Sequence, residues 1–208
     1  FKSNVHTKCI ALVHNMMPHW PTLLDKLFAP FYIKSTDAFV ALSQSVVQDI
    51  AALDKDKKEK RFSPHPTYDH YGTLLPKEEA CEQLLLDPTN DYMLFFGLVR
   101  EYKGLDLLLD AMQLVKDQLP NLRLLIAGEF YEDERKYREQ IKRNGLTERV
   151  IVRNEFVPDA DLRKYFGAAN LIVQPYKSAT QSGVTQVAFH FEKPILVTNV
   201  GGLGEIVH

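Results

Sequence analysis

The chain has 208 residues, of which 45% are hydrophobic and 25% charged, and its formal net charge of −2 excludes the strongly basic surface typical of proteins that bind nucleic acid. No apolar run reaches the ~18 residues of a membrane-spanning helix, and the two cysteines, Cys9 and Cys81, have no metal-ligand spacing. Reduced cysteines fit a cytoplasmic protein of one or two domains, and the ends at Phe1 and His208 suggest a fragment truncated on both sides.

Strands and helices alternate in the first part of the chain. Residues 8–13 have the apolar composition of a buried strand, and residues 22–33 carry leucine and phenylalanine at helical spacing. Residues 38–42 predict a second strand, and Ser43 predicts the N-cap of a helix that runs through Leu53. This order of elements predicts a parallel sheet.

A run of charges, DKDKKEKR at residues 54–61, interrupts the alternation. The run predicts a solvated loop, and the alternative is a weak peripheral contact with an anionic membrane surface. Residues 62–72 contain two prolines and a glycine and predict a linker. A helix with acidic residues in its first turn is expected at residues 76–86.

From Tyr92 onward the alternation restarts and is regular. The expected strands lie at residues 92–97, 122–127, 150–153, 171–173 and 195–197. The expected helices lie at residues 104–119, 132–143 and 159–168, followed by one that Gly183 begins and Pro194 ends. Five strands separated by helices predict a doubly wound α/β domain, in which ligands bind at the carboxyl ends of the strands.

The loop before the last of these helices offers groups that suit a phosphate. It holds Ser178, Thr180, Gln181 and Ser182, and the helix that begins at Gly183 has unpaired N–H groups and a partial positive charge at its start. The alternative is a polar surface loop with a serine N-cap. This stretch alone does not separate the two interpretations.

A second loop at the same edge of the predicted sheet carries two cations. Gly97 and Gly104 allow a ligand to approach the backbone closely, and Arg100 and Lys103 lie between them. A guanidinium fork together with an ammonium group suits a diphosphate, which favours a binding function for this loop. The alternative is a solvated loop whose two bases form ion pairs.

Three further segments are weaker candidates. Gly128-Glu129-Phe130 follows a strand, and a tight turn alone is the favoured interpretation, whereas the glycine-rich segment that ends at Glu205 is similar to a nucleotide-contact loop. His14 follows the first strand, where it could act on a substrate hydroxyl or phosphate or serve only as a hydrogen-bonded turn residue. The remaining histidines are irregularly spaced, so no metal site is predicted.

Taken together, these motifs resemble a known family. The segments FFGLVREYKGLDLLLDAM, LRLLIAGE, FVPDADLRKYFGAANLIVQPY and TNVGGLGEIV are similar to the C-terminal domain of retaining glycosyltransferases of the GT-B fold, in the sucrose-synthase-like family 4. The segments IALVHNMMPH, DAFVALSQSV and PHPTYDHYG resemble the end of that family's N-terminal domain and its interdomain crossing. The resemblance covers nearly the whole chain.

The resemblance implies two Rossmann-like domains. Residues 1–66 would be part of the N-terminal, acceptor-side domain, and residues 67–90 would be the linker and interdomain helix. Residues 91–208 would be a truncated C-terminal domain that binds a nucleotide sugar.

The same resemblance implies the site residues. Arg100 and Lys103 would hold the donor diphosphate, Gly97 would let the phosphates approach, and His14 would lie near the transferred sugar. The other donor contacts would be Thr180, Gln181, Ser182, Gly183 and Glu205. No metal ion, and no cofactor besides the donor, is implied.

The chain departs from the family pattern at three positions. Leu98 stands where many members have an arginine, and Ala179 and Val187 stand where many have two glutamates. Neutral groups would then bind the sugar and ribose hydroxyls in place of carboxylates. The candidates for this role are Thr180, Gln181, Ser182 and Gln186.

The function that the resemblance implies is enzymatic. The enzyme would move a sugar from a nucleotide-diphosphate-sugar donor to a hydroxyl acceptor with retention of configuration, in glycan or polysaccharide biosynthesis. Its acceptor would be a glycan or a lipid-linked saccharide, and it would work in the cytoplasm, including the inner face of the membrane. Two alternatives stay open: a sugar-nucleotide epimerase or hydrolase on the same fold, and a nucleotide-binding module without catalysis. Truncation also leaves open whether the chain by itself is active.

Overall fold

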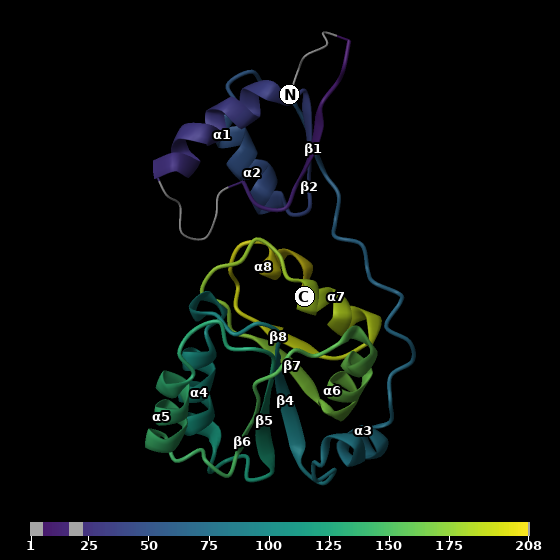
Figure 1. The fold of residues 1–208 in the computed structure, drawn as a ribbon, viewed down its shortest axis with the longest axis vertical. Coiled ribbons are helices and arrows are strands. Elements are labelled where there is room, and N and C mark those ends of the chain that lie inside the picture. The colour runs from purple at the N-terminus through teal and green to yellow at the C-terminus, as the bar shows by residue number, and fades with distance from the viewer. Residues whose placement is uncertain (1–5, 17–22, 208) are drawn as a thin grey trace. The chain divides into compact units, whose positions relative to one another are not determined.

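The computed structural model describes residues 6–16 and 23–207 of the chain, whose helices and strands are labelled in Figure 1. They form an α/β structure with two parallel sheets, so the class expected from the sequence is confirmed. The chain divides into two compact units. The first contains the range 1–66 with the segments 178–182 and 199–208, and the second contains residues 67–177 with 183–198.

The first unit is built on a parallel sheet with the strand order β1-β2-β3. Its elements are β1 (Ile10–Val13), α1 (Leu23–Ser35), β2 (Ala38–Ala41), α2 (Gln44–Leu53), β3 (Glu59–Phe62) and α8 (Leu203–Ile206). Helices α1 and α2 pack on one face of the sheet, because their buried side chains form one cluster with those of β1 and β2. Ser43 caps α2 as predicted, since its hydroxyl accepts a hydrogen bond from the Val46 N–H at 3.3 Å.

The prediction for the charge run is wrong in its second half. Residues 59–61, expected in a solvated loop, belong to β3, which pairs in parallel with β2. Lys58 Nζ donates to a carbonyl in the last turn of α1 at 2.6 Å, and Lys60 Nζ pairs with the buried carboxylate of Asp54. Although burial raises the pKa of Asp54, the hydrogen bonds from Lys60 and from the Lys58 N–H bring it below its ordinary value. Lys58 and Lys60 thus bind protein groups, which is why charge alone did not reveal the strand.

The second unit is built on a parallel sheet with the order β6-β5-β4-β7-β8, and the five expected strands are confirmed. They are β4 (Asp91–Phe96), β5 (Leu122–Ala127), β6 (Val150–Arg153), β7 (Leu171–Gln174) and β8 (Ile195–Val197). The helices are α3 (Lys77–Leu84), α4 (Leu105–Val115), α5 (Arg135–Arg143), α6 (Leu162–Ala168) and α7 (Gly183–His190), with short 3-10 turns η1 (Glu101–Lys103) and η2 (Asp159–Asp161). Helix ends differ from the expected ones by a few residues. In the described ranges, no helix has the length and apolar character needed to cross a bilayer.

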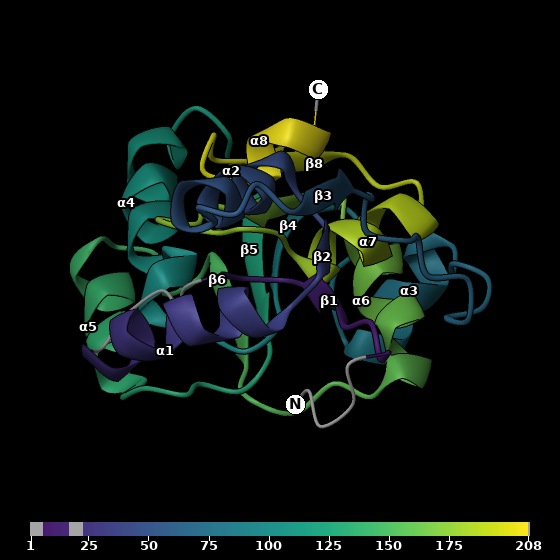
Figure 2. The same ribbon diagram turned by 90° about the horizontal axis from the view of Figure 1, so that it is seen from above.

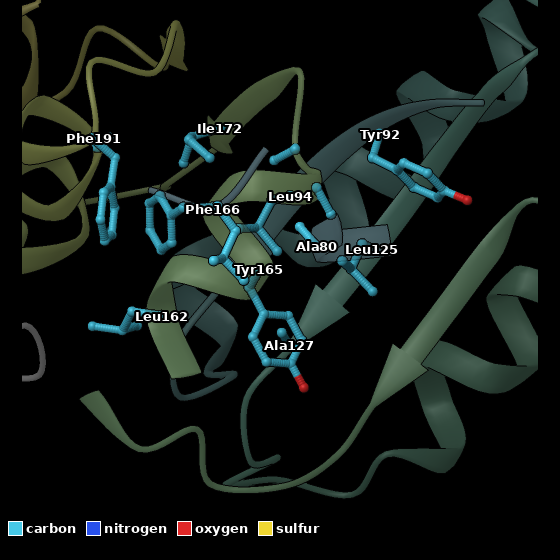
Figure 3. Close-up of a cluster of buried hydrophobic side chains, with 14 of the residues drawn as sticks. Ala80, Tyr92, Leu94, Leu125, Ala127, Leu162, Tyr165, Phe166, Ile172 and Phe191 are labelled. Atoms are coloured by element: carbon cyan, nitrogen blue, oxygen red, sulfur yellow. The ribbon is translucent and has the colours of Figure 1, made fainter. Parts of the chain in front are cut away.

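Helices cover both faces of this second sheet (Figures 1 and 2). Helices α4 and α5 pack on one face, where Leu109 and Ile141 join Ile126 of β5 in one buried cluster. Helices α3, α6 and α7 pack on the other face, where the ring centroids of Phe166 and Phe191 lie 5.5 Å apart (Figure 3). Burial on both faces explains why the strands are nearly continuous apolar runs in the sequence.

The strand order brings two loops together. In the sheet, β4 pairs on one side with β5, the next strand in the sequence. On its other side it pairs with β7, where Leu94 lies opposite Ile172. The order of the sheet therefore reverses between β4 and β7, and a ligand site is expected where the loops after these strands leave the carboxyl edge. The loop after β4 carries Lys103, and the loop after β7 leads to α7.

Candidate functional site

The loops after β4 and β7 are bonded to each other. The Lys177 N–H donates to the Tyr102 carbonyl at 2.7 Å, and Lys177 Nζ forms an ion pair with Asp106 at 2.7 Å. Gly104 has a φ of +70°, and a Cβ on it would lie 2.0 Å from the Pro175 carbonyl oxygen. Both the backbone conformation and the lack of space require glycine at this position, so the loop after β4 is held in place.

Lys103 lies at the centre of this arrangement. It ends the η1 turn, only 8% of the residue is exposed, and its Nζ lies 5.6 Å from the centre of the Tyr176 ring. A Cβ built on Gly97 would lie 3.1 Å from Lys103 Nζ and 3.7 Å from Cγ2 of Val184, the second residue of α7. The structure thus brings together the ammonium group, the bare backbone of Gly97 and the first turn of α7.

The charge of Lys103 lies in an unfavourable environment. Burial, with a further contribution from the Arg100 guanidinium, lowers the pKa of Lys103 to about 8. Across residues 6–16 and 23–207, Lys103 Nζ has no hydrogen bond or ion pair with another protein group. The start of α7 adds a partial positive charge next to it. A site of this kind suits an anion with more than one negative charge, such as a diphosphate.

Arg100 is held by an aromatic contact that the sequence did not reveal. Its guanidinium carbon lies 4.1 Å from the centre of the Tyr131 ring, a cation–π distance. The Tyr131 N–H donates to the Val99 carbonyl at 3.1 Å, which ties the loop after β5 to the loop after β4. Arg100 is therefore a second cation near Lys103, but it stacks on a tyrosine.

A buried polar network supports the start of α7. The Thr185 hydroxyl donates to Gln174 Oε1 at 2.7 Å, and Gln174 Nε2 donates to the Tyr176 hydroxyl at 3.3 Å. These bonds connect the end of β7, the first turn of α7 and the ring next to Lys103. Sequence reasoning missed this network, although a glutamine at the end of an otherwise apolar strand is the kind of buried polar group that needs a partner.

The predicted donor contacts Thr180, Gln181 and Ser182 belong to the first unit together with His14, whereas Lys103 and Gly183 belong to the second unit. The side-chain nitrogen of Gln181 lies 2.8 Å from His14 Nδ1, and the Thr180 hydroxyl is hydrogen-bonded to the Asn15 side chain. Gln181 Oε1 is buried and has no hydrogen-bond partner among the residues that the structure describes. The turn after β1 thus meets the segment 178–182, which also contains the buried Ser182. This group of amide, imidazole and hydroxyl groups can bind sugar hydroxyls.

Glu205 makes a contact that the sequence did not predict. Its carboxylate oxygens accept hydrogen bonds from the N–H groups of Gln44 at 2.7 Å and Ser45 at 2.8 Å, the first two residues of α2. A carboxylate at a helix start is stabilised by the unpaired N–H groups and by the helix dipole. The donor contact expected of Glu205 stays a prediction, and the role observed here is the capping of α2.

A hollow of about 310 Å³ lies beyond the carboxyl ends of β4, β5 and β6. Its lining residues are Phe96, Gly97, Leu98, Gly128, Glu129, Phe156 and Val157. Gly128 has a φ of +141°, and a Cβ on it would lie 2.3 Å from the Gly97 carbonyl oxygen. The backbones of the loops after β4 and β5 are therefore in contact at these two glycines. Gly97 therefore borders both Lys103 and the hollow. The turn at Gly128-Glu129, which the sequence favoured as purely structural, forms part of a cavity wall.

The described residues contain no group of three or more histidine, cysteine, aspartate or glutamate side chains placed to hold a metal ion. Lys103, Arg100 and the start of α7 are the groups placed to hold a substrate anion.

Comparison with known sequences identifies related proteins. Residues 90–208 match the protein family described as Glycosyl transferases group 1. The lipopolysaccharide core biosynthesis mannosyltransferase LpsB of Rhizobium meliloti is 28% identical over 195 residues, which are 86% of this chain and 50% of LpsB. The GDP-mannose:glycolipid 4-beta-D-mannosyltransferase of Xanthomonas campestris is 32% identical over 104 residues, which are 50% of this chain and 29% of that protein. The chain thus spans half the length of these relatives or less.

Solved glycosyltransferase structures share the fold of this chain. The structure of HepE from Anabaena in complex with UDP matches 97% of this chain and 56% of that chain, with a TM-score of 0.80 and 18% sequence identity. The GT-B fold expected from the sequence is confirmed by neighbours of this kind.

Proposed function

The chain belongs to the glycosyl transferases group 1 family, and from that premise we propose that it binds a nucleotide-diphosphate-sugar donor and serves the transfer of the sugar to a hydroxyl acceptor. One observation carries the proposal. Lys103 is a buried cation that has no counter-charge within the described part of the chain, and it lies between the backbone of Gly97 and the first turn of α7. A donor diphosphate supplies the negative charge that this arrangement lacks.

The proposed catalysis is electrostatic. When the bond between the sugar carbon and the diphosphate oxygen breaks, its electron pair stays on the diphosphate. The acceptor oxygen forms the new bond to the sugar carbon, and its proton passes to the leaving diphosphate. Lys103, Arg100 and the N–H groups at the start of α7 stabilise the negative charge that grows on the leaving group. We propose that the anomeric configuration is retained, which is the outcome that the family resemblance implies.

The proposed acceptor is a glycan or a lipid-linked saccharide, and the proposed location is the cytoplasm. The names of the two relatives refer to the lipopolysaccharide core and to a glycolipid, which supports this class of acceptor. UDP bound to HepE supports a nucleotide donor. His14 and Gln181 are proposed to bind hydroxyls of the sugar or acceptor, because they form one polar group after β1.

Labelled nucleotide sugars test this function. Each donor is incubated with the full chain in the presence and absence of a lipid-linked or glycan acceptor, and the products are separated. Label that moves to the acceptor supports the transferase. Free or epimerised sugar without an acceptor supports a hydrolase or epimerase, and binding without any product supports a nucleotide-binding module.

Donor affinity is expected to fall above pH 8. With a pKa of about 8 in the unliganded protein, Lys103 is mostly charged at pH 7 and loses its charge at higher pH. Because a bound diphosphate favours the charged form, the affinity should drop by up to about tenfold per pH unit between pH 8 and the pKa of the complex. Isothermal titration of a nucleoside diphosphate between pH 7 and pH 9.5 measures the slope.

The matched variant for this measurement is Lys103→Arg. A guanidinium group keeps its charge over the whole range, so the slope should become flatter even if the affinity itself changes. A wild-type affinity that is constant from pH 7 to pH 9.5 would contradict the role of Lys103.

A further inference from the structure

We infer that the hollow next to Gly97 binds the base of the donor and that Glu129 selects guanine. The inference rests on the proposed function, since it assumes that a nucleoside diphosphate lies at Lys103. It assigns a role to Glu129, which has no part in the proposed function. Glu129 lines the hollow, and its side chain is exposed rather than packed into the protein.

The position of the hollow fits a base. Gly97 borders Lys103 Nζ on one side and the hollow on the other, so a diphosphate at Lys103 has the cavity as its immediate neighbour. At about 310 Å³ the hollow lies at the lower end of the size range of ligand pockets, which is appropriate for one part of a ligand rather than all of it.

The walls of the hollow are suited to a flat aromatic ring. Phe96, Leu98 and Val157 are apolar, and Phe156 is 70% exposed at the rim. An exposed phenylalanine beside a cavity offers a face on which a base can stack, and stacking of this kind is tolerant of the identity of the base. The apolar wall therefore predicts binding of a base but does not select one.

Selection among the bases comes from the carboxylate of Glu129 in the wall of the hollow. The Glu129 side chain forms no hydrogen bond or ion pair with the described residues. Its backbone is fixed, because its carbonyl accepts the Val99 N–H at 2.8 Å and the next N–H, that of Phe130, donates to Asn154 Oδ1 at 3.1 Å. The turn thus holds an unused carboxylate at the cavity wall.

A carboxylate accepts hydrogen bonds and donates none, so it distinguishes the edges of the four bases. Guanine presents two adjacent donors, N1–H and the N2 amino group, which can bind both carboxylate oxygens. Uracil presents one N–H between two carbonyl oxygens, and these repel a carboxylate. Adenine and cytosine each present an amino donor next to a ring nitrogen that is an acceptor. Only guanine matches Glu129 at both oxygens.

Isothermal titration with GDP, UDP, ADP, CDP and IDP tests the inference. A good bidentate pair discriminates by about 1–3 kcal/mol, so GDP is expected to bind about tenfold to 100-fold more tightly than UDP. IDP, which lacks the N2 amino group, should bind less tightly than GDP. Glu129→Gln should remove most of the preference for GDP, because GDP loses the bidentate pair while UDP, no longer repelled by the carboxylate, binds as well as before or more tightly.

The control is Glu148→Gln, which makes the same change of charge. Glu148 is exposed and precedes β6, at the opposite edge of the sheet from the hollow, so neither affinity should change. Thermal unfolding of both variants checks that they are folded. If none of the five nucleotides binds, the donor proposal itself fails. If they bind equally, or if Glu129→Gln keeps the GDP preference, the guanine inference is overturned and the donor proposal stands.

Discussion

Replacing Lys103 with methionine is expected to stabilise the unliganded chain and to weaken the binding of a nucleoside diphosphate by about 100-fold or more. The stabilisation follows from burial, because the folded protein holds this charge with little solvent and, among the described residues, without a hydrogen bond or ion pair. A pKa lowered from 10.5 to about 8 means that the folded state binds the proton less tightly than the unfolded state. The destabilising effect is therefore present below pH 8 and is relieved as the pH rises toward 10.5.

The expected gain in the free energy of unfolding at pH 7 is roughly 3–4 kcal/mol, since the pKa is lowered from 10.5 to about 8 and each pKa unit corresponds to about 1.4 kcal/mol. Urea unfolding without ligand measures the stability, and isothermal titration measures the affinity. Lys142→Met is the control, because Lys142 is exposed on α5 and its replacement should change stability by less than about 0.5 kcal/mol. A Lys103→Met variant that is less stable and binds normally would show that the charge is structural.

Replacing Gly104 with alanine is expected to destabilise the second unit by about 3–5 kcal/mol, which is an exceptional loss for one methyl group. Two effects add up. The φ of +70° is strained for a residue with a side chain, and the new Cβ would lie 2.0 Å from the Pro175 carbonyl oxygen. Because backbone rather than a flexible side chain lies at that point, the loops after β4 and β7 must separate.

Gly183→Ala is the matched control for this prediction. Gly183 is the first residue of α7, and a Cβ on it would have no atom within 4 Å. Alanine also favours the helix, so the change should be neutral or stabilising by up to about 1 kcal/mol. Urea unfolding of the two variants gives the comparison, and a Gly104→Ala protein as stable as Gly183→Ala would show that the loops yield easily.

The strands of the second unit could be predicted because the sheet is covered on both faces. Segments such as residues 92–97 and 122–127 must be apolar throughout, and this makes them visible in the sequence. Strand β3 could not be predicted, because Lys60 reaches a buried aspartate instead of solvent. A pattern based on charge does not show where the end of a long side chain lies.

The candidate site could be predicted only in part, because some of its contacts join segments far apart in the sequence. Lys103 and Gly97 lie in one short loop after a recognisable strand, so their proximity follows from the local sequence. The hollow depends on residues from the ends of three strands, among them Phe156, and the stacking of Arg100 on Tyr131 depends on a loop that starts after another strand. Contacts between segments far apart in the sequence are set by packing, which local patterns do not record.

One departure from the family pattern gains a physical reason. Val187 stands where the resemblance to the family implies a glutamate, and the residue is only 6% exposed within the apolar cluster of the second unit. A carboxylate in that environment would be strongly disfavoured unless it were paired. The valine is therefore compatible with this core.

The bonds between residues 102–106 and residues 175–177 have a consequence for protein engineering. A chimera that imports only the first segment from a homologue risks a bulkier residue opposite the Pro175 carbonyl, and one that imports only the second loses the Lys177 partner of Asp106. The two segments therefore act as a single transplantable cassette. A graft between homologues is therefore expected to keep its stability only when both segments are exchanged together.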